Sequence, residues 1–186
     1  IYLKREDGLA DEPKIVSMGA YGAGVSFFTV KGWVEELLHA LNTPKAKFVA
    51  EHGNASYHPG RCAKVYVGEE YIGVFGQIHP EVAKNYGVDA ELYCAELSFD
   101  VLCSVKGGIP VYKPLPKFPS VTRDIAVVCS SDITVGELTD CILASGGQYL
   151  KDCTLFDVYT GHHIAEGMKS VAFSLTMRAD DQTLTD

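Results

Sequence analysis

The sequence predicts an α+β fold with two domains, each built on a mainly antiparallel sheet. Short β-branched and aromatic runs, separated by tight turns, outnumber the segments with helical periodicity. A segment with two glycines and four prolines, residues 106–120, separates two groups of elements and has the composition of an extended linker. We therefore expect domains at residues 1–106 and 121–186, joined by a linker at residues 107–120.

The first domain is expected to be a sheet with few helices. Its predicted strands are residues 15–18, 25–30, 45–51, 62–67, 71–78 and 92–99. Apolar side chains recur at helical spacing over residues 31–41, which predicts one helix that ends at Asn42. Residues 58–60 predict a turn, Gly68 begins a hairpin, and Pro80 suits the first turn of a short helix.

The second domain is expected to have the element order β-α-β-β. Its predicted strands are residues 123–129, 150–159 and 170–177. Thr134, followed by Glu137 three residues later, predicts a capping box at the start of a helix that Gly146 ends. This order is the first part of the ferredoxin-like βαββαβ pattern. Thr183 or Thr185 suits the cap of a further helix, so we expect the natural protein to continue past the last residue.

The charge and composition exclude several classes of function. The formal net charge of −8, from 16 Lys+Arg and 24 Asp+Glu, argues against unspecific polyanion binding, so DNA is not an expected partner. No segment has the apolar length of a membrane span, and no leader of signal-peptide type is found. The six cysteines form no CxxC pair and lie mostly in apolar runs. They predict reduced, buried thiols and a cytoplasmic location.

Two stretches, residues 113–128 and 155–175, carry residue types that can bind a nucleotide. Asp157 and Tyr159 are two apart on a predicted strand and therefore share one face. A carboxylate can accept hydrogen bonds from a base, and a tyrosine ring can stack on it. The pattern alone leaves open the alternative of an amphipathic strand with a solvated polar face.

No catalytic residue and no metal site is predicted. His58, Arg61 and His79 have side chains suited to acid–base chemistry, but their local sequences are typical of turns and helix starts. No nucleophile with a base and an orienting partner is recognisable. His162 and His163 could bind a metal or a phosphate, although the simpler interpretation is two exposed loop residues.

The run HPGRCAKVYVGEEYIGVFGQIHPEV, residues 58–82, resembles the bacterial phenylalanyl-tRNA synthetase β subunit, in the catalytic-like domain of its C-terminal half. Residues 25–38 are similar to the strand–helix unit that precedes this run. FPSVTRDIAVV, residues 118–128, and the stretch 155–177 resemble the family's terminal ferredoxin-fold anticodon-binding domain. The resemblance covers nearly the whole chain. Residues 19–24 form a shorter segment than the family usually has at this place.

The resemblance implies a class II synthetase-like first domain without the ATP and amino-acid chemistry. It also implies that Ala126, Asp157, Tyr159 and Ser170 stand where the family contacts the anticodon. Arg123 and Lys169, which flank these positions, are expected to meet phosphates.

The resemblance further implies partners and cofactors. The expected partners are tRNA(Phe) and the synthetase α subunit, in an α2β2 heterotetramer. This chain is expected to bind no cofactor itself, whereas the holoenzyme would use ATP and Mg²⁺. The chain lacks the upstream parts of the β subunit and the acidic residues to which the family's magnesium site is assigned. The alternative function is a protein-interaction scaffold with no direct RNA contact.

Overall fold

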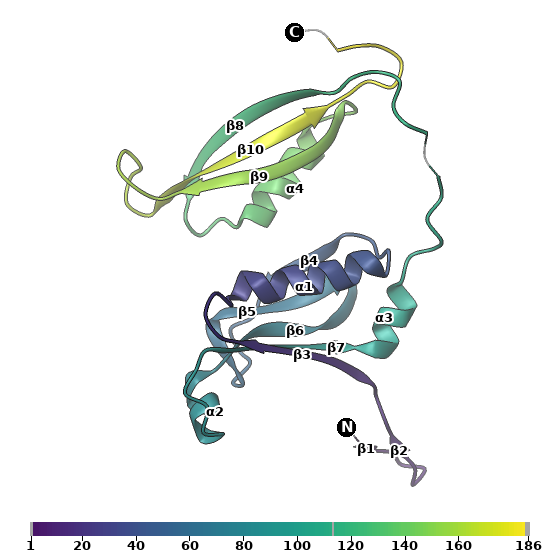
Figure 1. Cartoon of the computed structure of the whole chain (residues 1–186), viewed down its shortest axis with the longest axis vertical. Helices are drawn as coiled ribbons and strands as arrows, with labels where there is room; N and C mark the ends of the chain where they lie inside the picture. The colour runs from purple at the N-terminus through teal and green to yellow at the C-terminus, as the bar shows by residue number, and fades with distance from the viewer. Residues whose placement is uncertain (1, 113, 185–186) are drawn as a thin grey trace. The chain divides into compact units, whose positions relative to one another are not determined.

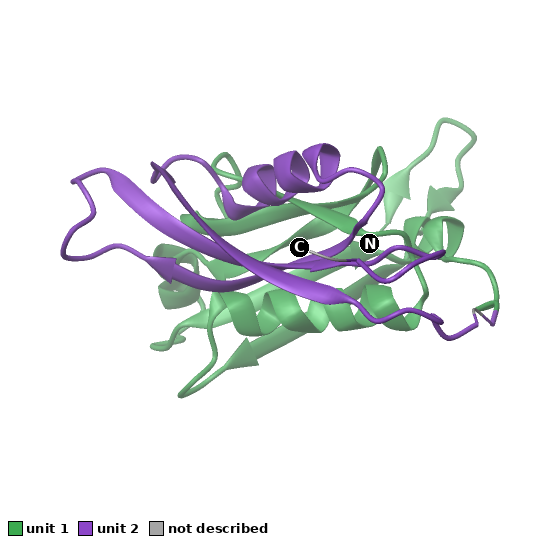
Figure 2. Cartoon of the chain, turned by 90° about the horizontal axis from the view of Figure 1, so that it is seen from above, with its two compact units in different colours: residues 1–111 green, residues 112–186 purple. Residues whose placement is uncertain are grey.

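The computed structural model describes residues 2–112 and 114–184 (Figure 1). The chain forms two compact units, residues 1–111 and residues 112–186 (Figure 2). Both units combine an antiparallel sheet with helices, so the predicted α+β class is confirmed. Each unit has a core of its own and is described by itself.

Unit 1 contains a five-stranded antiparallel sheet with the order β3-β7-β6-β5-β4. The strands are β3 (Ile15–Tyr21), β4 (Ala46–Ala50), β5 (Tyr57–Val67), β6 (Glu70–Ile78) and β7 (Leu92–Ser98). The helices are α1 (Phe27–Ala40), α2 (Pro80–Asn85) and α3 (Phe99–Val105). A short hairpin of β1 (Leu3–Lys4) and β2 (Ala10–Asp11) precedes the sheet. Helix α1 lies along one face of the sheet (Figure 1).

The main core of unit 1 lies between α1 and the sheet. Val30, Val34 and Leu38 recur every four residues along α1 and are buried in the same cluster as Phe75 of β6. Phe27 stacks on Phe75 with 4.9 Å between the ring centroids. Burying one such side chain contributes roughly 1.5–3 kcal/mol, so apolar packing holds this helix on the sheet.

The strand predicted at residues 25–30 is wrong, because α1 begins at Phe27. The hydroxyl of Ser26 accepts a hydrogen bond from the N–H of Thr29 at 3.3 Å. The hydroxyl of Thr29 accepts one from the N–H of Ser26 at 3.1 Å. This capping box satisfies two backbone N–H groups at the helix start. The β-branched and aromatic composition favours a strand, but propensity is weak compared with capping and tertiary packing.

Two further differences occur at the ends of strands in unit 1. Strand β7 stops at Ser98, whose hydroxyl accepts a hydrogen bond from the N–H of Val101 at 3.3 Å and caps α3. The sequence predicted only a strand over residues 92–99, so α3 is an additional helix. Residues 58–60, predicted as a turn, belong to β5, whose register with β6 shifts between Tyr57 and Cys62. The turn-like sequence therefore marks an irregularity within a strand.

Unit 2 is a three-stranded antiparallel sheet with the order β8-β10-β9 and with α4 on one face (Figure 1). Its elements are β8 (Val121–Ser130), α4 (Val135–Ser145), β9 (Leu150–Tyr159) and β10 (Met168–Met177). The predicted order and the capping box of Thr134 with Glu137 are confirmed. Cys129, Val171 and Phe173 are buried together with partly buried side chains of α4.

The helix predicted after β10 lies largely outside the described residues. Thr183 lies in irregular backbone, while Thr185 and Asp186 fall outside the described residues. Within residues 2–112 and 114–184, no helix combines the length and the apolar composition needed to cross a membrane.

We predict that Phe173→Ala destabilises unit 2 by about 3–5 kcal/mol, the usual cost of truncating a buried aromatic side chain. Phe173 is 0% exposed, whereas Phe156 of β9 is 57% exposed, so Phe156→Ala is the matched control. Urea unfolding, monitored by hydrogen exchange of the amides in β8 and β10, measures the loss of unfolding free energy in each variant. Equal losses for the two variants would contradict the assignment of Phe173 to the core.

Candidate nucleic-acid interface

The sheet of unit 2 has one face that α4 does not cover. Val171 and Phe173 of β10 are fully buried in the core beneath α4. Side chains alternate between the two faces of a strand, so Ser170 and Ala172 face away from α4. We call this the open face. Its central residues are Ala126, Val128, Asp157, Tyr159, Ser170 and Ala172.

The strand register brings four of the six predicted RNA-contact residues onto the open face. Ala172 of β10 pairs with Ala126 of β8 and with Asp157 of β9. In the adjacent row, Ser170 pairs with Tyr159. Directly paired residues have Cβ atoms about 4.5–5.5 Å apart. Ala126, Asp157, Tyr159 and Ser170 therefore form one continuous patch.

A β-bulge in β9 decides that Asp157 and Tyr159 lie on the open face. Cys153 pairs with Leu175 and belongs to the core beneath α4. With uninterrupted alternation, Asp157 and Tyr159 would lie on the same covered face as Cys153. The register with β10 shifts just before Asp157, where Phe156 has no partner. This extra residue reverses the alternation and turns the end of β9 outward.

The two central side chains of the patch are accessible. Tyr159 is 46% exposed, and its hydroxyl donates a hydrogen bond to the carbonyl oxygen of His162 at 3.2 Å. Asp157 is exposed, and within the described parts of the chain its carboxylate accepts no hydrogen bond from the protein. Both oxygens of this carboxylate are therefore available to donors of a ligand.

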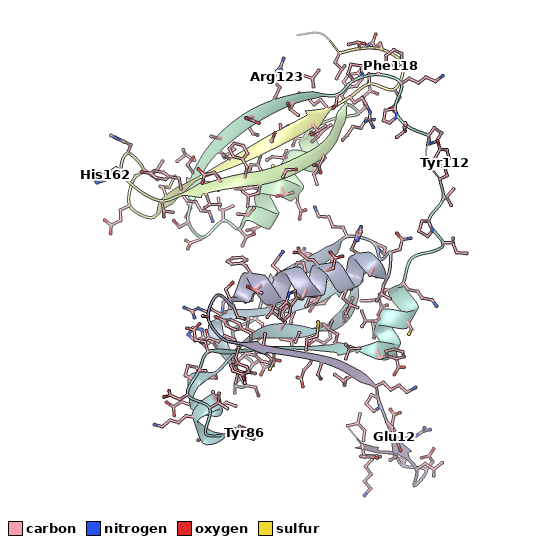
Figure 3. The ribbon with its side chains drawn as sticks, in the orientation of Figure 1. Glu12, Tyr86, Tyr112, Phe118, Arg123 and His162 are labelled. Atoms are coloured by element: carbon pink, nitrogen blue, oxygen red, sulfur yellow. The ribbon has the colours of Figure 1, made fainter. Side chains whose placement is uncertain are left out.

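The remaining two predicted contacts, Arg123 and Lys169, do not join the patch. Lys169 pairs with Cys129 and Arg123 pairs with Leu175, so alternation places both away from the open face. The Nζ of Lys169 donates to the carbonyl oxygen of Ser131 at 3.1 Å. Arg123 lies five positions along the ladder from Ser170, a distance of about 17 Å, at the opposite end of the sheet from the loop of His162 (Figure 3).

Sequence reasoning missed Ala172, which lies at the centre of the open face. It separates Ala126 from Asp157 in the same row, so two adjacent strands carry alanine there. Two small side chains side by side leave a flat surface beside the carboxylate. The signal was present in the hairpin, because pairing Tyr159 with Ser170 also places Ala172 opposite Asp157.

The two loop histidines do not form a metal site with their neighbours. His162 and His163 are exposed, with 6.4 Å between their ring centroids. Across residues 2–112 and 114–184, no group of three His, Cys, Asp or Glu side chains is arranged to hold a metal ion.

In the segment of residues 58–82 in unit 1, the side chains of His58, Arg61 and His79 stabilise local structure. The Nδ1 of His58 accepts a hydrogen bond from the N–H of Gly60 at 3.1 Å. The Nδ1 of His79 accepts one from the N–H of Glu81 at 3.2 Å and caps α2. Arg61 donates to the side-chain oxygen of Gln77 at 2.7 Å and pairs with Glu91 at 3.2 Å.

Both units match known protein families. The family model described as the phenylalanyl tRNA synthetase beta chain CLM domain matches residues 1–99, more than half of the chain. The chain belongs to the phenylalanyl-tRNA synthetase β-chain family. A second model, the ferredoxin-fold anticodon binding domain, matches residues 116–186, which contain the open face. The resemblance stated from the sequence motifs is therefore confirmed.

Curated relatives of this synthetase β-chain segment are named phenylalanine–tRNA ligase β subunits. The protein from Clostridium tetani is 40% identical over 188 residues, which cover 100% of this chain and 24% of the relative. The protein from Clostridium acetobutylicum is 39% identical, with coverages of 98% and 23%. The protein from Bacillus subtilis is 43% identical, with coverages of 87% and 20%. The chain thus spans about a quarter or less of the length of these relatives.

The synthetase-like unit 1 has a second buried cluster, formed by Tyr57, Cys62 and Val74. Burial raises the pKa of the Cys62 thiol to about 11, and it raises the pKa of the Tyr57 hydroxyl as well. A nucleophilic cysteine needs a lowered pKa, because the thiolate is the reactive form. Cys62 therefore has the properties of a structural residue.

We predict that iodoacetamide at pH 9 alkylates the exposed Cys103 and Cys141 and leaves Cys62 unmodified in the folded protein. With a pKa of about 11, only ~1% of Cys62 is thiolate at that pH, and burial excludes the reagent further. Mass spectrometry of the three peptides, before and after urea unfolding, measures the difference. Alkylation of Cys62 at the rate of Cys103 before unfolding would contradict the prediction.

Proposed function

We propose that this chain recognises the anticodon region of tRNA(Phe) through the open face of unit 2, as part of a phenylalanine–tRNA ligase β subunit. One observation carries the proposal: Asp157, Tyr159 and Ser170 share one uncovered sheet face, in a segment that matches an anticodon-binding family. Unit 1 would contribute a scaffold without catalytic groups.

The side chains of the patch suit an unstacked base. Bases in single-stranded loops expose their edges and are recognised by hydrogen bonds and stacking. The Asp157 carboxylate can accept two hydrogen bonds, which matches the adjacent N–H donors on the edge of guanine. Ser170, opposite Tyr159, can donate or accept one more.

The apolar part of the patch suits the face of the base. Tyr159 can stack on a base, which contributes ~1–3 kcal/mol. Ala126 and Ala172 present only methyl groups in the row of Asp157, so a planar ring can approach the sheet there. We propose that one base lies over these alanines with its edge toward Asp157.

Phosphate contacts are proposed to be few. Lys169 is next to Ser170 and could leave the carbonyl of Ser131 to meet a phosphate. Arg123, at the far end of β8, would meet the phosphate of a more distant nucleotide. The net charge of −8 agrees with recognition by base contacts more than by counterion release.

The remaining expectations concern the whole enzyme. We propose that the α subunit performs the ATP- and Mg²⁺-dependent charging of tRNA(Phe) in a cytoplasmic α2β2 heterotetramer, and that unit 1 packs on α. Residues 107–120 would act as the linker between residues 1–106 and 121–186.

The alternative of a protein-interaction scaffold has some support in unit 1. Helix α1 exposes two aromatic side chains, Phe28 at 75% and Trp33 at 44%, and aromatic residues are enriched at protein interfaces. This observation concerns unit 1 only, so it is compatible with RNA recognition by unit 2. A scaffold without RNA contact would be favoured if substitutions on the open face left tRNA charging unchanged.

We predict that Tyr159→Ala, made in the intact β subunit co-purified with α, raises KM for tRNA(Phe) about 5- to 150-fold. This range corresponds to the ~1–3 kcal/mol of a lost base stack. Asp157→Ala is expected to have an effect of similar size, because it removes charge-assisted hydrogen bonds. Aminoacylation measures KM, and ATP–pyrophosphate exchange with phenylalanine should be unchanged.

The matched control for these two variants is Val158→Ala. Val158 lies between Asp157 and Tyr159, pairs with buried Val171 and therefore belongs to the other face. It should leave KM for tRNA(Phe) unchanged. If Tyr159→Ala lowers aminoacylation and ATP–pyrophosphate exchange equally, the proposed role is refuted.

We predict that Ala172→Leu raises KM for tRNA(Phe) about tenfold or more, because a branched side chain would occupy the flat surface that the base needs. Ala172→Gly keeps that surface flat and is the control, with KM close to that of the wild type. Ala172 lies on the open face, so the urea midpoint of Ala172→Leu should remain close to wild type. Full tRNA activity of Ala172→Leu would exclude a base from this position.

A further inference from the structure

Gly161, two residues beyond Tyr159, lies directly against the ring of that tyrosine. A Cβ atom added to Gly161 would meet the Tyr159 side chain at 2.5 Å from Oη, 2.6 Å from Cζ and 3.0 Å from Cε2. The neighbouring residue, His162, accepts the hydrogen bond of the Tyr159 hydroxyl through its carbonyl oxygen at 3.2 Å. Two consecutive loop residues therefore fix the outer end of the ring.

The glycine at position 161 is needed for space and not for backbone conformation. At the other end of the loop, Gly167 has a φ of +77°, which favours glycine because L side chains rarely adopt it. Gly161 is not among the glycines with positive φ, and a substituent could adopt its backbone conformation. What a side chain would disturb at this position is the tyrosine ring.

We infer that Gly161 is a positioning residue for base recognition: it allows the ring of Tyr159 to lie against the loop, in one orientation, before RNA binds. The inference rests on the proposed role of Tyr159 in stacking on an anticodon base. A side chain that is already held loses less conformational freedom on binding, which costs about 0.5–1.5 kcal/mol for each side chain that must be ordered. The loop thereby prepares the stacking surface.

The test is Gly161→Ala in the intact β subunit, assayed with the α subunit. The three atoms nearest to the added methyl group all belong to the far end of a rotatable side chain, so the ring should move while the fold persists. We expect KM for tRNA(Phe) to rise about two- to tenfold. ATP–pyrophosphate exchange, kcat and the urea midpoint should stay at the wild-type values.

A double-mutant cycle separates positioning of Tyr159 from a general effect on the loop. If Gly161 acts through Tyr159, then adding Gly161→Ala to Tyr159→Ala changes KM no further. Gly136→Ala on α4 is the matched glycine control, because an added Cβ there meets only Thr134 Oγ1 at 3.8 Å. It should leave KM for tRNA(Phe) unchanged.

The outcomes distinguish this inference from the proposed function. An unchanged KM for Gly161→Ala, together with a raised KM for Tyr159→Ala, would overturn the positioning role and leave anticodon recognition standing. A rise of equal size with and without Tyr159 would also overturn it, since the glycine would then act through the loop. An unchanged KM for Tyr159→Ala would remove the proposed function itself and the inference with it.

Discussion

One extra residue in a strand determines the character of the whole second unit. Because Phe156 is unpaired, β9 serves two different surfaces: its first half supplies Cys153 to the core, and its second half supplies Asp157 and Tyr159 to the open face. The first half of β9 is therefore held by apolar packing, and its second half, only a few residues later, presents polar groups to the open face. The polar end is held firmly because its partner β10 is anchored by fully buried Val171 and Phe173.

The sequence was sufficient to predict an element where local signals agree with the tertiary structure. One example is α4, whose capping box and apolar spacing predict the same helix. It failed at residues 25–30, where composition favours a strand and the Ser26 cap with packing on Phe75 decides for α1. The spacing of Asp157 and Tyr159 predicted a shared face but not which one, since the bulge is a property of pairing. Ala172 was missed for the same reason, because its place between Ala126 and Asp157 follows from the pairing of three strands.

The two units differ in whether their polar side chains have partners within the protein. In unit 1, Arg61 pairs with Glu91, and the Nδ1 atoms of His58 and His79 accept hydrogen bonds from backbone N–H groups two residues further along the chain. These side chains, although suited to chemistry by type, are occupied in holding strand ends and a helix start. In unit 2, the carboxylate of Asp157 has no such partner among the described residues. An acidic protein with an unsatisfied acceptor beside an exposed aromatic ring is suited to binding base edges more than phosphate backbones.

The hairpin of β9 and β10 also has a consequence for how the protein folds. Asp157, Tyr159 and Ser170 lie close together in the chain, so their mutual geometry depends on contacts of short sequence separation. Such contacts form early, and a hairpin closes in about 1–10 μs. Ala126 joins from β8, across the intervening helix, and its loop closure is slower. The hairpin alone can therefore bring Asp157, Tyr159, Ser170 and Ala172 together during synthesis, whereas Ala126 joins them only when β8 pairs with β10.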